Sequence, residues 1–88
     1  MLDYMRQIQW TMKALRQLRK IKNKRQQAKI YDAVDGLKDF PNCPNVKKLK
    51  NRSEYRLRIG SWRVLFTETL EIISIEEVRK RNERTYSG

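Results

Sequence analysis

Apolar residues recur at every second position in residues 6–10, RQIQW, which is typical of a short strand that buries Ile8 and Trp10. Thr11 follows this strand and can cap a helix, because its hydroxyl can accept a hydrogen bond from the first helical turn. Beyond Thr11 the spacing of apolar residues becomes helical. The apolar face of this first helix contains Ala14, Leu15, Leu18 and Ile21. The pattern therefore predicts a strand followed by an amphipathic helix that ends near Asn23.

A second amphipathic stretch follows and ends before FPNCPN, residues 40–45, where two prolines and two asparagines indicate a loop. The two helices are expected to form a short hairpin. Their polar faces carry the basic run RQLRKIKNKRQQAK, residues 16–29, which amphipathicity explains as a solvated outer face and which can also be interpreted as a nucleic-acid surface. The apolar face of the second helix contains Ile30, Tyr31, Val34 and Leu37.

Three strand-like segments, rich in β-branched and aromatic residues, occupy the second half of the chain. Strand, two helices and three strands in this order predict an α+β fold. We expect a small antiparallel sheet made of an N-terminal strand and a three-strand C-terminal meander, with the helix hairpin on one face and the other face open. Residues 1–88 are expected to form one domain. The three segments are KKLKNRSEYRLRIG (47–60), SWRVLFTE (61–68) and LEIISIEEV (70–78).

The first two of these segments are predicted to form a hairpin around Gly60 and Ser61. Glycine at the first central position suits a two-residue turn. Counting outward from this turn makes one side of the hairpin wholly apolar, and that side should pack under the helices. The predicted apolar pairs are Ile59 with Trp62, Leu57 with Val64, and Tyr55 with Phe66.

Arginines occupy the opposite side of the same hairpin. Arg58 faces Arg63, and Arg56 lies two residues along the strand. Like charges directly opposite each other are destabilising by about 0.2–1 kcal/mol. Glu54 or Glu76 could balance these arginines if they are merely solvated, but the hairpin itself places no acid among them. Because planar guanidinium groups match phosphate oxygens bidentately, the pattern favours phosphate binding.

The overall charge points to the same kind of partner. The 88 residues include 21 Lys and Arg against 10 Asp and Glu, a formal net charge of +11, which favours a polyanion such as nucleic acid. Cys43 is the only cysteine and there is no histidine, so the residues offer neither a disulfide framework nor a Cys/His zinc site. We expect no metal and no cofactor. Without an apolar signal segment or membrane span, the chain is expected to be cytoplasmic.

The last residues, RKRNERTYSG, continue the basic character. If the final strand ends near Val78, then Arg79, Lys80 and Arg81 emerge at one edge of the open sheet face. Tyr86 is then available to stack on a base.

At this point the chain resembles the RelE/ParE superfamily of bacterial toxins from toxin–antitoxin pairs. The resemblance rests on IQWTMKALRQLRKI near the start, on LKNRSEYRLRIGSWRVLF after a loop, and on the closing EVRKRNERTY. It implies the RelE fold, in which a small antiparallel sheet is flanked by helices. In the RelE branch it also implies metal-independent cleavage of messenger RNA in the ribosomal decoding site, by attack of the ribose 2′-hydroxyl on the adjacent phosphate.

The resemblance also implies roles for individual residues. Arg56, Arg58 and Arg63 match basic positions of the RelE-like site, Arg81 matches the arginine after the last strand, and Tyr86 matches the tyrosine beyond it. These five are the predicted catalytic residues: Arg58 and Arg63 stabilise the charged phosphorane, Arg81 assists the leaving group, and Tyr86 stacks on a base. Neighbouring basic residues are assigned to RNA binding: Lys48, Lys50, Arg79, Lys80 and Arg84.

The general base separates two branches of the superfamily. Where RelE carries lysines this sequence has Arg56 and Arg58, and arginine stays protonated in proteins. Lys48, Lys50 or Glu54 would have to act as base, or catalysis must proceed by orientation and charge stabilisation. The alternatives are a ParE-like inhibitor of DNA gyrase, which binds without cutting RNA, and a non-catalytic basic nucleic-acid-binding domain. The expected partners are a cognate antitoxin and mRNA on the ribosome, with contacts to 16S rRNA and none to a membrane.

Overall fold

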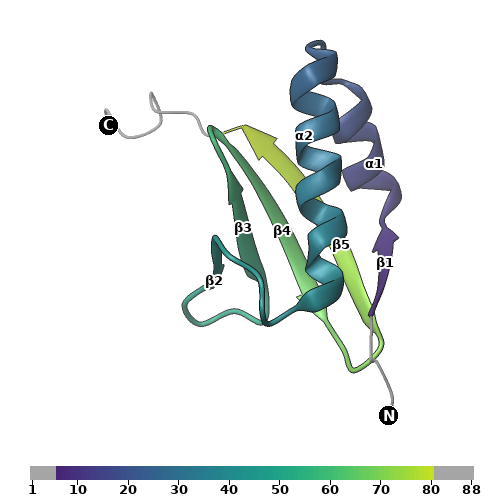
Figure 1. Cartoon of the computed structure of the whole chain (residues 1–88). Coiled ribbons are helices and arrows are strands. Elements are labelled where there is room, and N and C mark those ends of the chain that lie inside the picture. Colours follow the sequence, from purple (N-terminus) through teal and green to yellow (C-terminus); the bar gives the residue numbers. More distant parts are fainter. Residues whose placement is uncertain (1–5, 81–88) are drawn as a thin grey trace.

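The computed structural model describes residues 6–80, which form two α-helices packed on a five-stranded sheet (Figure 1). The helices lie side by side, and together with the apolar side of the sheet they enclose one hydrophobic core. None of the helices in these residues is long and apolar enough to cross a membrane. In chain order the elements are β1 (Gln7–Trp10), α1 (Met12–Arg19), α2 (Lys24–Asp35), the 3₁₀ helix η1 (Gly36–Asp39), β2 (Val46–Lys48), β3 (Tyr55–Ile59), β4 (Trp62–Glu68) and β5 (Ile72–Lys80).

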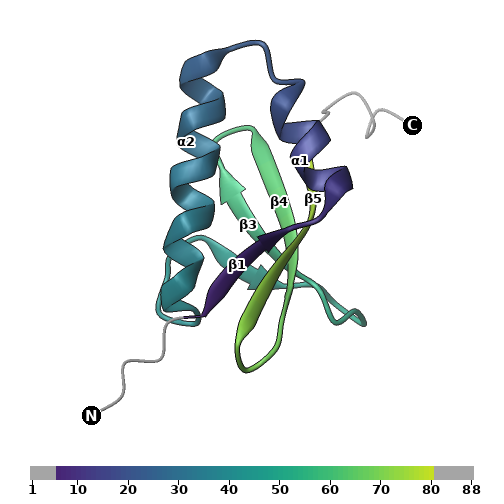
Figure 2. The same cartoon turned by 90° about the vertical axis from the view of Figure 1, so that its right-hand side faces the viewer.

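The strand order in the sheet is β1-β5-β4-β3-β2. This arrangement confirms the predicted α+β class, the N-terminal strand, the helix hairpin and the antiparallel run β3-β4-β5. The sheet is mixed rather than wholly antiparallel, because β1 lies parallel to β5 (Figure 2). The segment 47–60 is not one strand either. A turn that contains Asn51, with φ 59°, separates β2 from β3, so the sheet gains an edge strand that the local pattern did not predict.

Both helices begin at the polar residues that the sequence marks. The Thr11 hydroxyl accepts a hydrogen bond from the Ala14 N–H at 3.1 Å and donates one to the Ile75 carbonyl at 2.8 Å, so it caps α1 and ties it to β5. Asn23 was predicted as the end of the first helix. It lies between the helices and caps α2, since its side-chain oxygen accepts from the Gln26 N–H at 3.0 Å.

The core confirms most of the predicted apolar faces. Phe66 is fully buried, with its ring 5.6 Å from that of Phe40 and 5.5 Å from that of Tyr55. Tyr31 is an exception, because it is 53% exposed and stacks on Trp10 at 6.0 Å instead of entering the core. The other predicted positions of the two helices are buried or partly buried in the core: Ala14, Leu15, Leu18, Ile21, Ile30, Val34 and Leu37.

The β3–β4 hairpin has the register counted from its turn. Gly60 adopts φ 58°, a value that glycine tolerates better than any residue with a side chain. The predicted apolar pairs are all present, and their side chains belong to the core beneath the helices. Successive side chains of a strand alternate between faces, so the arginines of the hairpin lie on the opposite face. The observed pairs are Tyr55 with Phe66, Leu57 with Val64, and Ile59 with Trp62.

Candidate nucleic-acid interface

Three arginines form a row near the β3–β4 turn, one from each of three adjacent strands. Arg58 on β3 is opposite Arg63 on β4, and Arg63 is opposite Arg79 on β5. Neighbouring strands lie about 4.8 Å apart, so the row spans about 10 Å. The face that carries this arginine row is the one turned away from the helices. Three guanidinium groups at this spacing form a compact cationic strip.

Arg63, at the centre of the row, is the least satisfied of the three. Its Nε is buried, and it has no hydrogen-bond partner within residues 6–80. Neither Arg58 nor Arg63 forms an ion pair with any residue in the part of the chain that the structure describes. A buried donor without a partner costs about 1–3 kcal/mol, and opposed like charges add to that cost. A bound anion would relieve the repulsion between the opposed charges.

Arg79 differs from the other two because it forms an ion pair with a carboxylate. Glu77, two residues earlier on β5, accepts a hydrogen bond from the Arg79 Nε and forms an ion pair with Lys13 of α1 at 3.4 Å. Burial alone would raise the pKa of Glu77, but the hydrogen bond and charge of Arg79, together with Lys13, hold that pKa below its ordinary value. The expectation that no acid lies among the arginines therefore applies to the hairpin and not to the whole face.

Glu77→Gln should lower stability at neutral pH and not in acid. The pKa of Glu77 is lower in the folded chain than the value of about 4.3 expected when unfolded. Its contribution to the free energy of unfolding is therefore complete above that value and is lost as the pH falls through the folded pKa. Urea unfolding of the variant and the wild type should differ at pH 7 and converge in acid. Glu71→Gln, at an exposed turn residue, is the matched control, and an equal loss at pH 7 in both variants would contradict this account.

Arg56 lies on the same face as the arginine row, and β2 brings Lys47 next to it. Lys47 is opposite Arg56 in the register, so its side chain shares that face. The predicted RNA-binding residue Lys48 points the other way, since its Nζ lies 6.0 Å from the centre of the Tyr55 ring, on the core side. Lys50 is exposed in the turn between β2 and β3. Sequence reasoning missed Lys47 because β2 was not recognised as a separate strand.

Lys80 was expected beside Arg79 but lies on the opposite face. It pairs with Trp62 in the register, and its Nζ is 5.9 Å from the centre of the Trp62 ring. The reason is that β5 continues to Lys80 instead of ending near Val78, so side chains still alternate at the end of the strand. Arg79 joins the arginine row, and Lys80 joins the side of the helices.

A bulge adds a second carboxylate to the arginine face. The register between β4 and β5 shifts at Leu65/Phe66, so that Leu65 is opposite Glu77 and Phe66 is opposite Ile75. Glu76 is the extra residue, and its carboxylate accepts hydrogen bonds from the Ser74 hydroxyl at 2.9 Å and the Thr67 hydroxyl at 3.4 Å. The sequence contained no signal for this irregularity. Within residues 6–80, no cluster of His, Cys, Asp or Glu is able to hold a metal ion.

Comparison with known families identifies the kind of protein that carries this interface. A family described as the ParE toxin of the type II toxin–antitoxin system parDE matches residues 8–85, which is most of the chain. The chain belongs to the ParE toxin family. This confirms the predicted membership of the RelE/ParE superfamily, and the protein is the toxin of a type II toxin–antitoxin pair.

Solved structures confirm the fold of the toxin. One chain of the RelBE2 toxin–antitoxin complex from Mycobacterium tuberculosis is 22% identical with a TM-score of 0.76, over 88% of this chain and 99% of that one. A chain of the archaeal RelE–RelB complex from Pyrococcus horikoshii is 20% identical with a TM-score of 0.75, over 90% and 98%. A chain of the RelB–RelE complex from Methanococcus jannaschii is 18% identical with a TM-score of 0.63, over 90% and 95%. A search of curated proteins gave no match.

Three predicted site residues of the toxin lie outside the described residues: Arg81, Arg84 and Tyr86. The other predicted residues divide between two faces. The arginine face holds Arg58, Arg63 and Arg79 in register with one another and Arg56 two residues along β3. Lys48 and Lys80 lie on the helix side, and Lys50 lies in the turn between β2 and β3.

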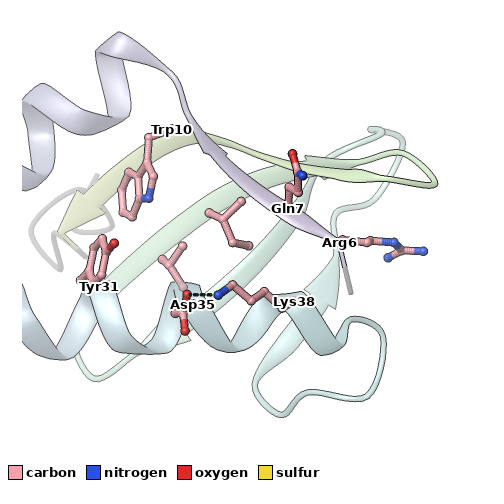
Figure 3. A pocket seen from close by; sticks show the side chains of 8 residues that line it. Arg6, Gln7, Trp10, Tyr31, Asp35 and Lys38 are labelled. Carbon is pink, nitrogen blue, oxygen red and sulfur yellow. Dashed lines mark ion pairs between the residues drawn. The ribbon is translucent and has the colours of Figure 1, made fainter. Parts of the chain in front are cut away.

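One groove in the surface of the toxin lies beside the arginine row, and another lies at a distance from it. A groove of about 490 Å³ at the β3 edge includes Arg58 and Lys29 in its lining. Another, of about 500 Å³, lies between β1 and α2, where Trp10 stacks on Tyr31 (Figure 3). In that second groove Lys38 is paired with Asp35 at 2.9 Å, so its charge is already balanced. The candidate interface is therefore the arginine face and not the groove between β1 and α2.

Proposed function

We propose that this toxin is a ribosome-dependent endoribonuclease that cleaves messenger RNA and so inhibits translation. The observation that carries the proposal is the arginine row, in which the central Arg63 has a buried Nε without a partner in residues 6–80. A phosphate of an RNA strand would balance the opposed charges of the row. The resemblance to RelE supports cleavage rather than binding alone.

The proposed reaction needs no redox step and no cofactor. The 2′-oxygen of a ribose attacks the adjacent phosphorus, the bond from phosphorus to the 5′-oxygen breaks, and a cyclic phosphate and a 5′-hydroxyl are formed. The proton of the 2′-hydroxyl goes to a base or to water, and the leaving 5′-oxygen gains a proton. Arg58 and Arg63 stabilise the extra negative charge of the phosphorane. Arg81 assists the leaving oxygen, and Tyr86 stacks on a base, as the resemblance implies.

Fixed charge, rather than an efficient general base, is the main source of catalysis in this proposal. Arg56 and Arg58 do not lose a proton at physiological pH. Lys48 lies on the other face of the sheet, and Glu54 is paired with Arg52 at 3.0 Å. Lys47, opposite Arg56, is a lysine that the described part of the chain places on the arginine face.

Single-turnover cleavage should therefore stay nearly flat between about pH 6 and 8. Arg58→Lys should keep the charge but lose the bidentate geometry, and so lower the rate moderately without a new ionisation in that range. Lys47→Met and Lys48→Met form a matched pair, because adjacent lysines lie on opposite faces. A steep rising limb that disappears only in Lys47→Met, with RNA binding unchanged, would make Lys47 the base and overturn the charge-stabilisation account.

The partner that restrains the toxin is a cognate antitoxin in this proposal. The similar chains from M. tuberculosis, P. horikoshii and M. jannaschii were solved in toxin–antitoxin complexes. A chain with a net charge of +11 calls for an acidic partner, and a partly helical segment that folds on binding would cover or distort the arginine face. Co-expression with the neighbouring small open reading frame should suppress growth arrest and yield a complex that co-purifies.

The site of action follows from the substrate. Messenger RNA in the ribosomal decoding site places the toxin in the cytoplasm, with contacts to 16S rRNA as well as to the message. No metal takes part in the proposed reaction.

One observation favours a second candidate function, inhibition of DNA gyrase. The family that matches the chain is described as ParE, and the superfamily contains ParE-like members that bind gyrase without cutting RNA. In that case the arginine face would act by binding alone.

Brief induction separates the two functions. Protein and DNA synthesis are followed by pulse labelling in the first minutes after the toxin is induced. The proposal predicts that translation stops first, with RNA broken and DNA intact. Arrest of replication with DNA damage, while RNA stays whole, would support the gyrase inhibitor instead.

A further inference from the structure

A second cationic surface covers the tip of the helix hairpin, on the other side of the sheet from the arginine row. Figure 1 shows that the turn between α1 and α2 projects past the end of the sheet. Each of its basic side chains is exposed, and none forms an ion pair within residues 6–80. No acidic residue occurs between residues 12 and 31. This hairpin patch consists of Arg16, Arg19, Lys20, Lys22, Lys24 and Arg25.

The dipole of α1 favours Arg16 and Arg19, which lie in its last turn, but helix stability does not explain the α2 part of the hairpin patch. Lys24 and Arg25 occupy the first turn of α2, which contains no acid, although the positive end of a helix dipole disfavours cations. Arg16 repels Arg19 and Lys20, because side chains three and four positions apart on a helix are neighbours. A solvated outer face would need only polar residues here. The concentration of charge against these local preferences indicates a polyanionic ligand.

Hydrogen bonds fix which side of α2 faces outward. The Gln26 side chain accepts a hydrogen bond from the Trp62 Nε1 of β4 at 3.3 Å, and the Gln27 amide donates to the Leu18 carbonyl of α1 at 3.0 Å. The neighbouring Lys24, Arg25 and Lys29 are exposed. Arg25 and Lys29 are four residues apart, about 6 Å along the helix axis, which corresponds to about two phosphates of one nucleic-acid strand.

The hairpin patch extends to the end of the sheet. Lys80, whose Nζ lies over Trp62, adds its charge next to Gln26 of α2. Lys29 lines a groove together with Gly60 and with Arg58 of the arginine row. Asp32 and Asp39 line the same groove, so a groove of mixed charge separates the cations of the two faces.

We propose that the hairpin patch is a second nucleic-acid-binding surface that takes the phosphate backbone of double-helical RNA. The arginine row, a narrow strip on a sheet, suits a single strand at the point of reaction. The projecting tip of two helices presents separated cations without apolar surroundings, which suits a folded, uniformly charged duplex. The toxin would then be anchored on structured RNA by one surface while the other engages the strand to be cut. This inference rests on the proposed function for its RNA partner, and it assigns that contact to residues other than those of the arginine row.

The test measures binding of the full chain to a 2′-O-methyl RNA duplex, which cannot be cleaved by 2′-hydroxyl attack, by fluorescence anisotropy over a range of salt concentrations. Lys24→Gln/Arg25→Gln should weaken duplex binding about tenfold and reduce the slope of log K against log salt by about two. The control is Lys38→Gln/Arg52→Gln, which removes the same charge from cations that already pair with Asp35 and Glu54. It should change the affinity less than twofold.

Two further measurements show whether weaker duplex binding comes from lost phosphate contacts at the hairpin patch. The melting temperature of Lys24→Gln/Arg25→Gln should be unchanged or higher, since its charges oppose the α2 dipole. Arg63→Ala should leave duplex binding intact, so a failure of the cleavage proposal leaves this one standing.

Equal weakening in the control variant would show that duplex binding depends only on the net charge of the protein. Tighter binding of a DNA duplex would make the hairpin patch a DNA-binding surface. Loss of antitoxin binding without any duplex binding would make it a protein interface. Each of these three results overturns the proposal.

Discussion

Replacing Arg63 with alanine is expected to abolish toxicity while the fold is retained. Arg63 lies at the centre of the arginine row, and its Nε has no partner in residues 6–80 that the substitution would leave unsatisfied. Loss of one positioned donor to a developing negative charge lowers catalysis by about 10²–10³-fold. The melting temperature should stay the same or rise, because repulsion from Arg58 and Arg79 is removed. Growth after induction and thermal unfolding together check this expectation.

The control for this prediction is Arg52→Ala. Arg52 is exposed in the turn before β3 and is paired with Glu54, so its loss removes the same side chain away from the row. This variant should remain toxic. Full toxicity of Arg63→Ala, or a marked fall in its melting temperature, would count against the placement of Arg63 at the reacting phosphate.

Phe66→Ala is expected to remove a large part of the stability of the protein. Phe66 is fully buried on β4, in contact with the rings of Phe40 and Tyr55. Removing a buried phenylalanine side chain costs about 3–5 kcal/mol. A domain of this size has a total stability of about 5–10 kcal/mol, so the variant should show a strongly lowered urea midpoint.

Tyr31→Ala provides the comparison for Phe66→Ala. Tyr31 is also aromatic, but it is 53% exposed and its ring stacks on that of Trp10. Its removal should cost less than about 1.5 kcal/mol. Equal losses in the two variants would show that the core does not depend on Phe66.

Local patterns in the sequence predicted the features that depend on near neighbours. The Gly60–Ser61 turn was enough to set the register of β3 and β4, and with it the opposition of Arg58 and Arg63. The Thr11 cap was predictable for the same reason, because it acts within one helical turn.

Non-local pairing was beyond the reach of those patterns. The parallel pairing of β1 with β5 joins segments more than sixty residues apart, and nothing in RQIQW indicates the direction of its partner. The bulge at Leu65/Phe66 likewise gives no local signal, yet it places Glu76 beside Ser74 and Thr67 on the arginine face.

Two site residues were misplaced for a single reason, the alternation of side chains along a strand. Lys48 belongs to β2, which was expected to be part of one longer segment with β3. Lys80 belongs to the end of β5, which was expected to end near Val78. Once the strands are defined, alternation turns both lysines toward the helix side and leaves Lys47 and Arg79 with the arginines. The prediction of the site was limited by one strand that was not recognised, β2, and by one strand end that was misplaced, that of β5.

Mapping of RNA 5′ ends on ribosomes after brief induction tests the central claim most directly. Wild type, Arg63→Ala and Arg52→Ala are induced in parallel, and new 5′-hydroxyl ends are located on messenger RNA. The account predicts cuts in phase with codons in wild type and Arg52→Ala, and their absence in Arg63→Ala. Growth arrest by the wild type without any new RNA ends, or the same cuts in Arg63→Ala, would contradict it.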